Sequence, residues 1–502
     1  MPEKLSKLVK EAFDTGRISN LPNKHFIDGK LAASESGTEM ESFDPGTGKA
    51  FISFSSGEQD DVDKAVLAAK QAMTNGWGQS LPVNRSRVLY RASALILENL
   101  ERLAIAETLD CGKPLNESLG DVRGAARAFE YYAGSCDKLQ GDTFPLGPNH
   151  HGYSIHEPIG VTAHIVPWNF PLSTTARSVA PALAAGCSVV VKPAEQTPIT
   201  ALMLADILKQ AGLPRGVYNV VTGTGTNAGA PLVAHPDIDH ITFTGSVNTG
   251  ISVMKSAADN VTRLILELGG KSPITVLGDC DIDSALSGVL GAIFENAGQI
   301  CSAGSRLVIE RSIHEEFIEK LVSSTKALTI GHGLKDLQLG PVNSQQHLER
   351  IAEYLSDAKS RGLDIIAGGN VITDPRVGAG WFIEPTIIDN LQRNDRMCQE
   401  EIFGPVLAVQ VVDDFAEAVD VANDCDFGLV AGVYTSNFSK AHQFARDVNA
   451  GQIYVNEYFA GGIEVPFGGN KKSGFGREKG LEAVKSYCKI KSVATNISLL
   501  NK

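Results

Sequence analysis

The sequence predicts an α/β protein with two parallel-sheet domains in series. Short apolar strands alternate with helices of about ten residues over most of the 502-residue chain. Glycine is frequent, at 50 residues, and often stands where a predicted strand turns into a helix. This alternation is typical of doubly wound sheets, in which ligands bind outside the carboxyl ends of the strands.

The composition is that of a globular protein and excludes two classes of partner. Hydrophobic residues make up 43 % of the chain and charged residues 21 %. At roughly 100–200 residues per domain, the length predicts about three domains. The net charge of −13, without any basic run, argues against nucleic acid and anionic membranes as partners. Apolar stretches are too short to span a membrane.

The cysteines and the first residues predict a cytoplasmic protein. The eight cysteines are widely spaced, so the chain lacks the CxxC pairs of zinc or redox sites, and we expect no metal. A chain of this length does not need disulfides, which favours a reduced compartment. The first twenty residues mix Glu, Lys and Asp and contain neither a secretory h-region nor the acid-poor pattern of a transit peptide.

The first part of the chain predicts a hairpin and two helices. Asp28-Gly29 suits the turn of a hairpin over residues 25–31. Apolar residues between 62 and 73 recur at helical spacing and predict an amphipathic helix. A second, longer helix is expected from about 85 to 109, ended by the Asp-Cys-Gly-Lys-Pro run at 110–114.

The middle of the chain contains the strands of the first predicted sheet. They cover residues 159–166, 188–191, 217–221, 241–243 and 264–266, with a helix at 201–211 and another opened by Gly245. Residues 270–470 repeat the alternation, with strands at 274–276 and 307–309. From about 484 the tail alternates polar and apolar residues, which predicts an edge strand able to pair with another subunit.

Three turns in this region could contact a dinucleotide. Residues 245–250 place glycines where a strand turns into a helix, so backbone N–H groups could hold a phosphate, but an ordinary turn is as good an interpretation. The loop 223–229 resembles a dinucleotide loop with one residue too many, and a plain turn is favoured there. Lys192 and Glu195 follow a buried strand and could bind ribose hydroxyls, or could form a solvated pair.

Three residues are candidates for chemistry. Asn169 lies between Pro167 and Pro171, so its amide is either a rigid donor for an oxyanion or part of a structural turn. Glu267 follows an apolar strand and is either a general base with a raised pKa or a satisfied core acid. Cys301 is either a nucleophile or a buried small hydrophobe, and any histidine partner would come from elsewhere in the fold.

These motifs together resemble the aldehyde dehydrogenase superfamily along essentially the whole chain. The matching stretches occur in the family's order and spacing: VPWNFPL, PALAAG, VVKPAEQTP, GLPRGVYNVVTG, ITFTGS, LELGGKSP, AGQICSAGSR, EEIFGPV and PFGGNKKSGFGRE. The resemblance implies that Cys301 attacks the aldehyde carbon and later carries a thioester. It implies that the Asn169 amide and the Cys301 backbone N–H steady the oxyanion, and that Glu267 activates the water that hydrolyses the thioester.

The resemblance also implies NAD as the cofactor and assigns residues to it. Those residues are Lys192 and Glu195 at the adenosine ribose, Gly245 and Ser246 at the pyrophosphate, Trp168 at the border of the cofactor, and Glu401 with Phe403 at the nicotinamide ribose. The carboxylate of Glu195 would repel a 2′-phosphate, which predicts NAD over NADP.

The fold implied by the resemblance has three parts. A Rossmann-like cofactor domain is expected from residues 20–137 and 157–267, and an α/β catalytic domain from 268–470. A small β region for oligomerisation is expected from 138–156 and 484–500, because family members are usually dimers or tetramers.

The substrate tunnel departs from the family pattern and predicts a bulky aromatic or long-chain aldehyde. Arg177-Ser178 replaces a frequent Trp-Lys, Glu295 replaces a frequent aromatic residue, and Gly124 and Gly461 replace larger side chains, while Phe170 and Phe467 remain. The tunnel is neutral if Arg177 pairs with Glu295 or Glu464. A free Arg177 would instead bind the carboxylate of a semialdehyde, and the two glutamates could attract an aminoaldehyde.

Two other classes of protein resemble this chain less well. An enzyme that passes the thioester to coenzyme A does not need a water-activating base, so Glu267 favours hydrolysis. A homologue without turnover would be free to lose Cys301 or Glu267, and both are present.

Overall fold

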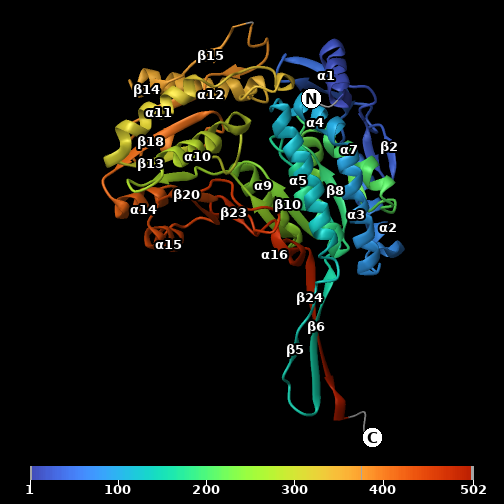
Figure 1. Ribbon diagram of the computed structural model, residues 1–502. Helices are drawn as coiled ribbons and strands as arrows, with labels where there is room; N and C mark the ends of the chain where they lie inside the picture. The colour runs from blue at the N-terminus through green and yellow to red at the C-terminus, as the bar shows by residue number, and fades with distance from the viewer. Residues whose placement is uncertain (1–2, 375, 499–502) are drawn as a thin grey trace.

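The computed structural model describes residues 3–374 and 376–498 and contains two large sheets, one in each half of the chain, and a projecting arm (Figure 1). The predicted α/β class is confirmed. The arm extends below the two halves in the view of Figure 1.

The first sheet has eight strands, of which the five central ones are parallel. In sheet order they are β2 (Lys30–Ala32), β1 (His25–Ile27), β9 (Tyr218–Val220), β8 (Ser188–Lys192), β7 (Val161–Ile165), β10 (His240–Thr244), β11 (Arg263–Glu267) and β23 (Gly474–Phe475). β1, β2 and β23 pair antiparallel at the edges. Helices cover both faces, so the central strands are continuously apolar, as Val189, Val190 and Val191 of β8 illustrate with 0 % exposure.

Nine helices of the described chain belong to this half. They are α1 (Glu3–Thr15), α2 (Gln59–Ala72), α3 (Pro82–Glu98), α4 (Leu100–Cys111), α5 (Leu115–Ala133), α6 (Pro171–Ala185), α7 (Ile199–Gln210), α8 (Ala230–Ala234) and α9 (Val247–Asn260). The single helix expected from 85 to 109 is wrong, because it is interrupted at Asn99. The Asn99 side chain donates to the Leu95 carbonyl at 2.9 Å, an alternative to continuing the helix.

The second sheet has seven strands, all parallel except β14 at its edge. In sheet order they are β14 (Asp364–Ala367), β17 (Thr386–Asp389), β18 (Val406–Val412), β13 (Arg306–Glu310), β12 (Pro273–Val276), β20 (Val430–Tyr434) and β21 (Gln452–Val455). The helices beside it are α10 (Ile282–Phe294), α11 (His314–Lys326), α12 (Gln345–Ser360), α13 (Arg396–Gln399), α14 (Phe415–Asn423) and α15 (Phe438–Asp447). α14 and α15 share one apolar cluster, and α10, α11 and α12 share another.

The arm is a three-stranded antiparallel sheet. It consists of β5 (Thr143–Phe144), β6 (His150–Pro158) and β24 (Cys488–Asn496). Only β24 follows the short helix α16 (Gly480–Ser486). The tail is an edge strand, as predicted, but it starts at Cys488 and pairs with β6 of its own chain. Residues 499–500 of the predicted oligomerisation region lie outside the described residues.

The C-terminal segment connects the two halves beside the cavity described below. After β22 (Asn470–Lys471), which pairs with β19 (Phe427–Gly428), the chain crosses over, and β23 joins the first sheet next to β11. Two further pairs complete the strands: β3 (Glu39–Asp44) with β4 (Lys49–Ser55), and β15 (Val371–Ile372) with β16 (Phe382–Ile383). In the described parts of the chain, every helix is too short or too polar to cross a bilayer.

Candidate active site

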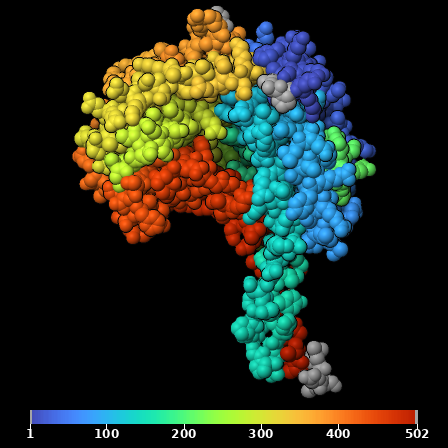
Figure 2. All heavy atoms as spheres, in the orientation of Figure 1, coloured from blue at the N-terminus to red at the C-terminus, as the bar shows by residue number. Residues whose placement is uncertain are grey.

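A cavity of about 950 Å³ receives residues from both halves of the chain, and Figure 2 shows the molecule hollowed between them. The predicted site residues that line it are Trp168, Asn169, Phe170, Arg177, Gly245, Ser246, Glu267, Glu295, Cys301, Glu401, Phe403 and Phe467. Lys192 and Glu195 lie outside this lining, although the adjacent Gln196 is part of it. The structure therefore brings together residues that the sequence separates by nearly three hundred positions.

Cys301 lies between a short helical turn at Glu295–Gly298 and β13, and it is part of the cavity lining. Burial raises its pKa to about 11, although the nearby Arg177 guanidinium acts to lower it. The thiol is therefore protonated at neutral pH, and its conversion to a thiolate needs a proton acceptor. Asn296 and Ala297, with φ of 47° and 53°, give the preceding turn its left-handed backbone.

Asn169 lies in the loop between β7 and α6 and is 5 % exposed. Its Nδ2 donates to the Gln299 carbonyl at 2.8 Å, and its own carbonyl accepts from Asn296 Nδ2 at 3.1 Å. One of its two amide hydrogens is thus committed to the loop that carries Cys301, and the second remains for another acceptor. The two loops are bonded to one another at this point.

Glu267 ends β11 and is 2 % exposed. Within the described residues, both of its carboxylate oxygens lack a hydrogen-bond partner. Burial and the neighbouring Glu478 raise its pKa well above the ordinary range, against the opposing charges of Arg177, Arg477 and Lys479. A buried, unpartnered carboxyl of this kind is suited to proton transfer.

Arg177 forms an ion pair with Glu478, through its Nε and the Glu478 Oε2. The expected pairing of Arg177 with Glu295 or Glu464 is therefore wrong. Glu464 lies at the surface and pairs with Arg127 at 2.6 Å. Glu478 belongs to the C-terminal segment, which packs next to α6 and places this carboxylate beside Arg177. The side chains of Arg177 and Glu478 are 14 % and 2 % exposed, so the guanidinium is held by this partner inside the molecule.

The turn between β10 and α9 carries Gly245 and Ser246. Ser246 is the N-cap of α9, and its Oγ accepts the Thr249 N–H at 3.3 Å. The helix N-terminus therefore faces the cavity with a partial positive charge. A Cβ at position 245 would come within 2.6 Å of the Phe243 ring, so this turn requires glycine or a shift of that ring.

Lys192 and Glu195 form an ion pair of 3.0 Å at the end of β8. Lys192 is 3 % exposed, and burial lowers its pKa against the opposing effect of Glu195. The lysine is thus held inside the protein, unlike the solvated pair that was the alternative interpretation.

Glu401 and two aromatic residues form a further wall. Burial raises the pKa of Glu401 to about 7, although the Gly270 N–H donates to its Oε1 at 2.9 Å. Phe403 adopts a φ of 63°, and its ring meets the Trp168 ring edge-on at a centroid distance of 5.3 Å. These residues come from two distant segments, at Trp168 and at 401–403, which meet in the cavity lining.

Several cavity residues were missed by the sequence analysis. His347 on α12 contacts the Phe403 carbonyl at 2.6 Å through Nε2, and Arg350, one turn later, donates to the Glu401 carbonyl at 2.9 Å. Burial lowers the pKa of His347 to about 4, so the ring is neutral. A helix whose polar face lines a cavity has no distinctive sequence pattern. For Glu478 the sequence did contain a signal, because this residue lies inside the PFGGNKKSGFGRE motif.

The cavity lining also contains a set of aromatic and acidic side chains. The set consists of Phe170, Tyr454, Phe459 and Phe467 together with Asp121 and Glu295. Burial and the Asp121 charge raise the pKa of Glu295.

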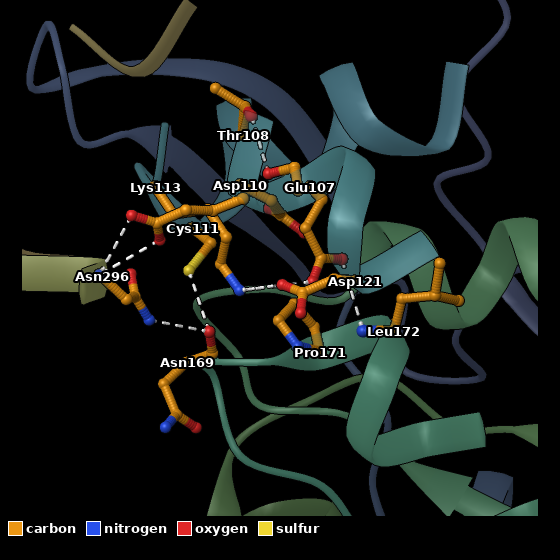
Figure 3. Close-up of polar contacts among 12 residues, drawn as sticks. Glu107, Thr108, Asp110, Cys111, Lys113, Asp121, Asn169, Pro171, Leu172 and Asn296 are labelled. Carbon is orange, nitrogen blue, oxygen red and sulfur yellow. Dashed lines mark hydrogen bonds and ion pairs between the residues drawn. The ribbon is translucent and has the colours of Figure 1, made fainter. Parts of the chain in front are cut away.

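A network of buried charged groups lies behind Asn169 (Figure 3). Lys113 forms ion pairs with Asp121 at 2.6 Å and with Glu107 at 3.7 Å. Burial raises the pKa of Glu107 to about 7, and Lys113 opposes that shift.

Comparisons with known proteins agree with this geometry. The model of the aldehyde dehydrogenase family matches residues 31–493. An aldehyde dehydrogenase from Enchytraeus buchholzi is 41 % identical over 94 % of this chain and 95 % of the relative, and the betaine aldehyde dehydrogenase of Bacillus subtilis (strain 168) is 38 % identical over 94 % and 97 %. The structure also resembles a mutant of P. syringae AldA, an indole-3-acetaldehyde dehydrogenase in complex with NAD+ and IAA. That match has a TM-score of 0.95 and 37 % identity, and it covers 98 % of this chain and 99 % of the other.

Proposed function

The chain belongs to the aldehyde dehydrogenase family and is an NAD-dependent enzyme, and we propose that it oxidises an aldehyde to a carboxylic acid through a thioester on Cys301. One observation carries the proposed route. Glu267, whose buried carboxyl has no hydrogen-bond partner among the described residues, lines one cavity together with Cys301 and Asn169.

Cys301 acts as the nucleophile. Because burial raises its pKa to about 11, the attack on the aldehyde carbon requires that the thiol first gives its proton to solvent in the cavity, and Glu267 is kept for the later hydrolysis step. The positive charge of Arg177 favours the thiolate. Sulfur and carbon form the new bond of a thiohemiacetal, whose oxygen takes the negative charge.

Asn169 stabilises that oxygen. Its amide retains one hydrogen beyond the bond to the Gln299 carbonyl, and its burial strengthens a bond to a charged acceptor. Loss of hydride from the thiohemiacetal carbon leaves a thioester. Glu267 then takes a proton from water, the hydroxyl adds to the thioester carbon, and the carboxylic acid leaves as the Cys301 sulfur is released.

The residues present fit NAD, which supplies the hydride acceptor when it is bound. The N-terminus of α9 offers backbone N–H groups to a pyrophosphate at Gly245 and Ser246. Lys192 and Glu195 offer partners for the adenosine ribose, and Glu401 for the nicotinamide ribose. A Cβ at Gly269 would come within 2.1 Å of the Glu401 carboxylate. Glycine at this position therefore provides the space that the carboxylate occupies. Trp168 and Phe403 form the apolar border.

We propose a bulky aromatic or long-chain aldehyde as the substrate. The four aromatic side chains at the substrate side support it, and the pairing of Arg177 with Glu478 removes the free cation on which a semialdehyde enzyme was expected to depend. One observation favours an aminoaldehyde as the second candidate, namely the carboxyl group of Glu295 in the lining.

The experiment is NADH formation by the purified protein with NAD and matched aldehydes of the aromatic, long-chain aliphatic, amino- and carboxy- classes. Highest kcat/KM for the aromatic or long-chain members supports the proposal, and highest kcat/KM for amino- or carboxy-aldehydes contradicts the substrate assignment. Coenzyme A is added in a parallel series. A requirement for it would contradict hydrolysis by Glu267.

We also propose that the three predicted parts have separate roles: residues 20–137 and 157–267 bind the cofactor, 268–470 contribute Cys301, and the arm at 138–156 and 484–500 joins subunits. Ile490, Ile155 and Phe144 are exposed on the arm, and β24 has one edge without a described partner strand. Light scattering during size-exclusion chromatography tests this, because Ile490→Lys should reduce the mass if the arm joins subunits.

A further inference from the structure

Lys113 is a lysine with 0 % exposure that follows helix α4. It is held by Asp121 and Glu107, the two carboxyl groups that lie 2.6 and 3.7 Å from its Nζ. A buried ammonium is costly unless it is paired, and removing it would leave the buried Glu107 and the partly buried Asp121 without their cation. The position of this group is therefore strongly determined.

The residues around Lys113 contact the loop that carries Asn169 at three points, of which Figure 3 draws the two hydrogen bonds. Its Nζ lies 3.9 Å from the centre of the Phe170 ring. Glu107 Oε2 accepts the Leu172 N–H at 3.3 Å, and Cys111 Sγ donates to the Asn169 carbonyl at 3.4 Å. Lys113 therefore packs against one face of the Phe170 ring. Asn169 and Leu172, before and after Phe170, are hydrogen-bonded to Cys111 and Glu107 of the same segment, 107–113.

The same segment also reaches the loop that carries Cys301. The Asn343 side chain donates to the Cys111 carbonyl at 3.3 Å, and the Asn343 N–H donates to Gln299 Oε1 at 2.8 Å. Gln299 in turn accepts the Asn169 amide through its carbonyl. Cys111, Asn343, Gln299 and Asn169 therefore form a closed ring of hydrogen bonds, next to Lys113.

We propose that Lys113, anchored by Asp121 and Glu107, is a positioning residue that holds the Asn169 amide in its orientation toward the reacting oxygen. This inference rests on the proposed function, since it assigns Asn169 the oxyanion. Lys113 itself is buried behind Phe170 and acts through the loop. Without the cation, Glu107 and Asp121 repel one another or bind protons, and the loop at 169–172 loses its fixed contacts.

A double-mutant cycle tests the coupling of Lys113 to Asn169. The measured quantity is the rate of the first NADH burst in rapid mixing, for Asn169→Ala, Lys113→Met and the double variant. Loss of one oxyanion donor costs roughly 10²–10³-fold. Lys113→Met is expected to slow the burst at least about tenfold through the same donor, and the double variant to match Asn169→Ala within about threefold. The affinity for NAD should be unchanged in all three.

Arg85→Met is the matched control. Arg85 is a buried cation on α3. It donates to the Ala184 carbonyl at 3.0 Å, at the C-terminal end of α6 and thus away from the Asn169 loop, which precedes the N-terminal end. Its loss lowers stability without touching the Asn169 loop, so its effect should add to that of Asn169→Ala. If Lys113→Met does not yield folded protein, Asp121→Asn takes its place in the same cycle, because it loosens the anchor and keeps the lysine.

The outcomes separate this inference from the proposed function. A slow Asn169→Ala variant with a near-normal Lys113→Met variant, or with additive effects, overturns the inference alone. A weakened affinity for NAD in Lys113→Met overturns it as well, because that result indicates general disorder. An undiminished burst in Asn169→Ala overturns both the oxyanion role and the inference.

Discussion

Arg177 on α6 forms a buried ion pair with Glu478, which belongs to the segment that crosses between the two sheets near the C-terminus. Both side chains lie close enough to Glu267 to influence its pKa, Glu478 raising it and Arg177 lowering it. The pair therefore connects the C-terminal segment to the proposed base, and Arg177 does not stand free in the substrate tunnel.

Removing Arg177 should destabilise the protein, and it should raise KM for charged and neutral substrates to a similar extent. Arg177→Met leaves Glu478 buried without its cation, at a cost of about 3–5 kcal/mol. Glu478→Gln together with Arg177→Met should recover part of that loss, measured by urea unfolding. The KM values for a carboxylated aldehyde and its neutral analogue should rise by similar factors. A steep rise for the carboxylated one alone would contradict the pairing as the role of Arg177.

Cys301→Ala should abolish NADH formation, because the alanine cannot form the thioester. Binding of NAD, measured by calorimetry, should persist. Cys425→Ala removes another partly exposed thiol and serves as the matched control, with turnover close to that of the unmodified enzyme. Turnover in Cys301→Ala would contradict the covalent route.

Glu267→Gln should permit one turnover and then stall, since water attack on the thioester lacks its proton acceptor. A general base contributes roughly 10²–10⁴-fold, so rapid mixing should show a burst near one NADH per site followed by a steady rate lower by that factor. If the burst and the steady rate fell equally, Glu267 would act in acylation instead.

The steady rate should fall as the pH is lowered, starting well above the ordinary pKa of a glutamate. Only the deprotonated carboxyl accepts a proton. Burial and the neighbouring Glu478 raise the pKa of Glu267, so the deprotonated form is lost at a higher pH than for an ordinary glutamate. The pH profile of hydrolysis of a preformed thioester measures this. Retention of the same acidic limb in Glu267→Gln would assign it to another group.

NAD should be preferred over NADP, and Glu195→Gln should narrow the preference. A carboxylate next to a 2′-phosphate costs about 1 kcal/mol in water at 4 Å and more in a protein, so the gap should shrink by about tenfold or more. The ratio of kcat/KM for the two cofactors measures it. Glu35→Gln, at an exposed ion pair with Lys64, is the control and should leave the ratio unchanged. Equal use of both cofactors by the unmodified enzyme would contradict the role of Glu195.

The sequence by itself determined the α/β class, the five parallel strands of the first sheet and many of the residues that line the cavity. Strands such as 188–191 are recognisable because a strand buried on both faces is continuously apolar. Asn169, Glu267 and Cys301 each stand in a contiguous motif at the end of a strand or in a loop, so local sequence was sufficient to identify them. The roles assigned to them stay predictions until the variants above are measured.

Only the tertiary structure decided which charged groups are partners. The sequence analysis offered Arg177 two acids, Glu295 and Glu464, and packing of the C-terminal segment gave it a different one, Glu478. The sequence analysis identified neither His347 nor the residues paired with Lys113, because a charged residue in a buried ion pair and one at the surface cannot be distinguished from the sequence alone. Contacts between residues hundreds of positions apart depend on how the two sheets and the crossover pack, and burial then sets the pKa of each group that meets there.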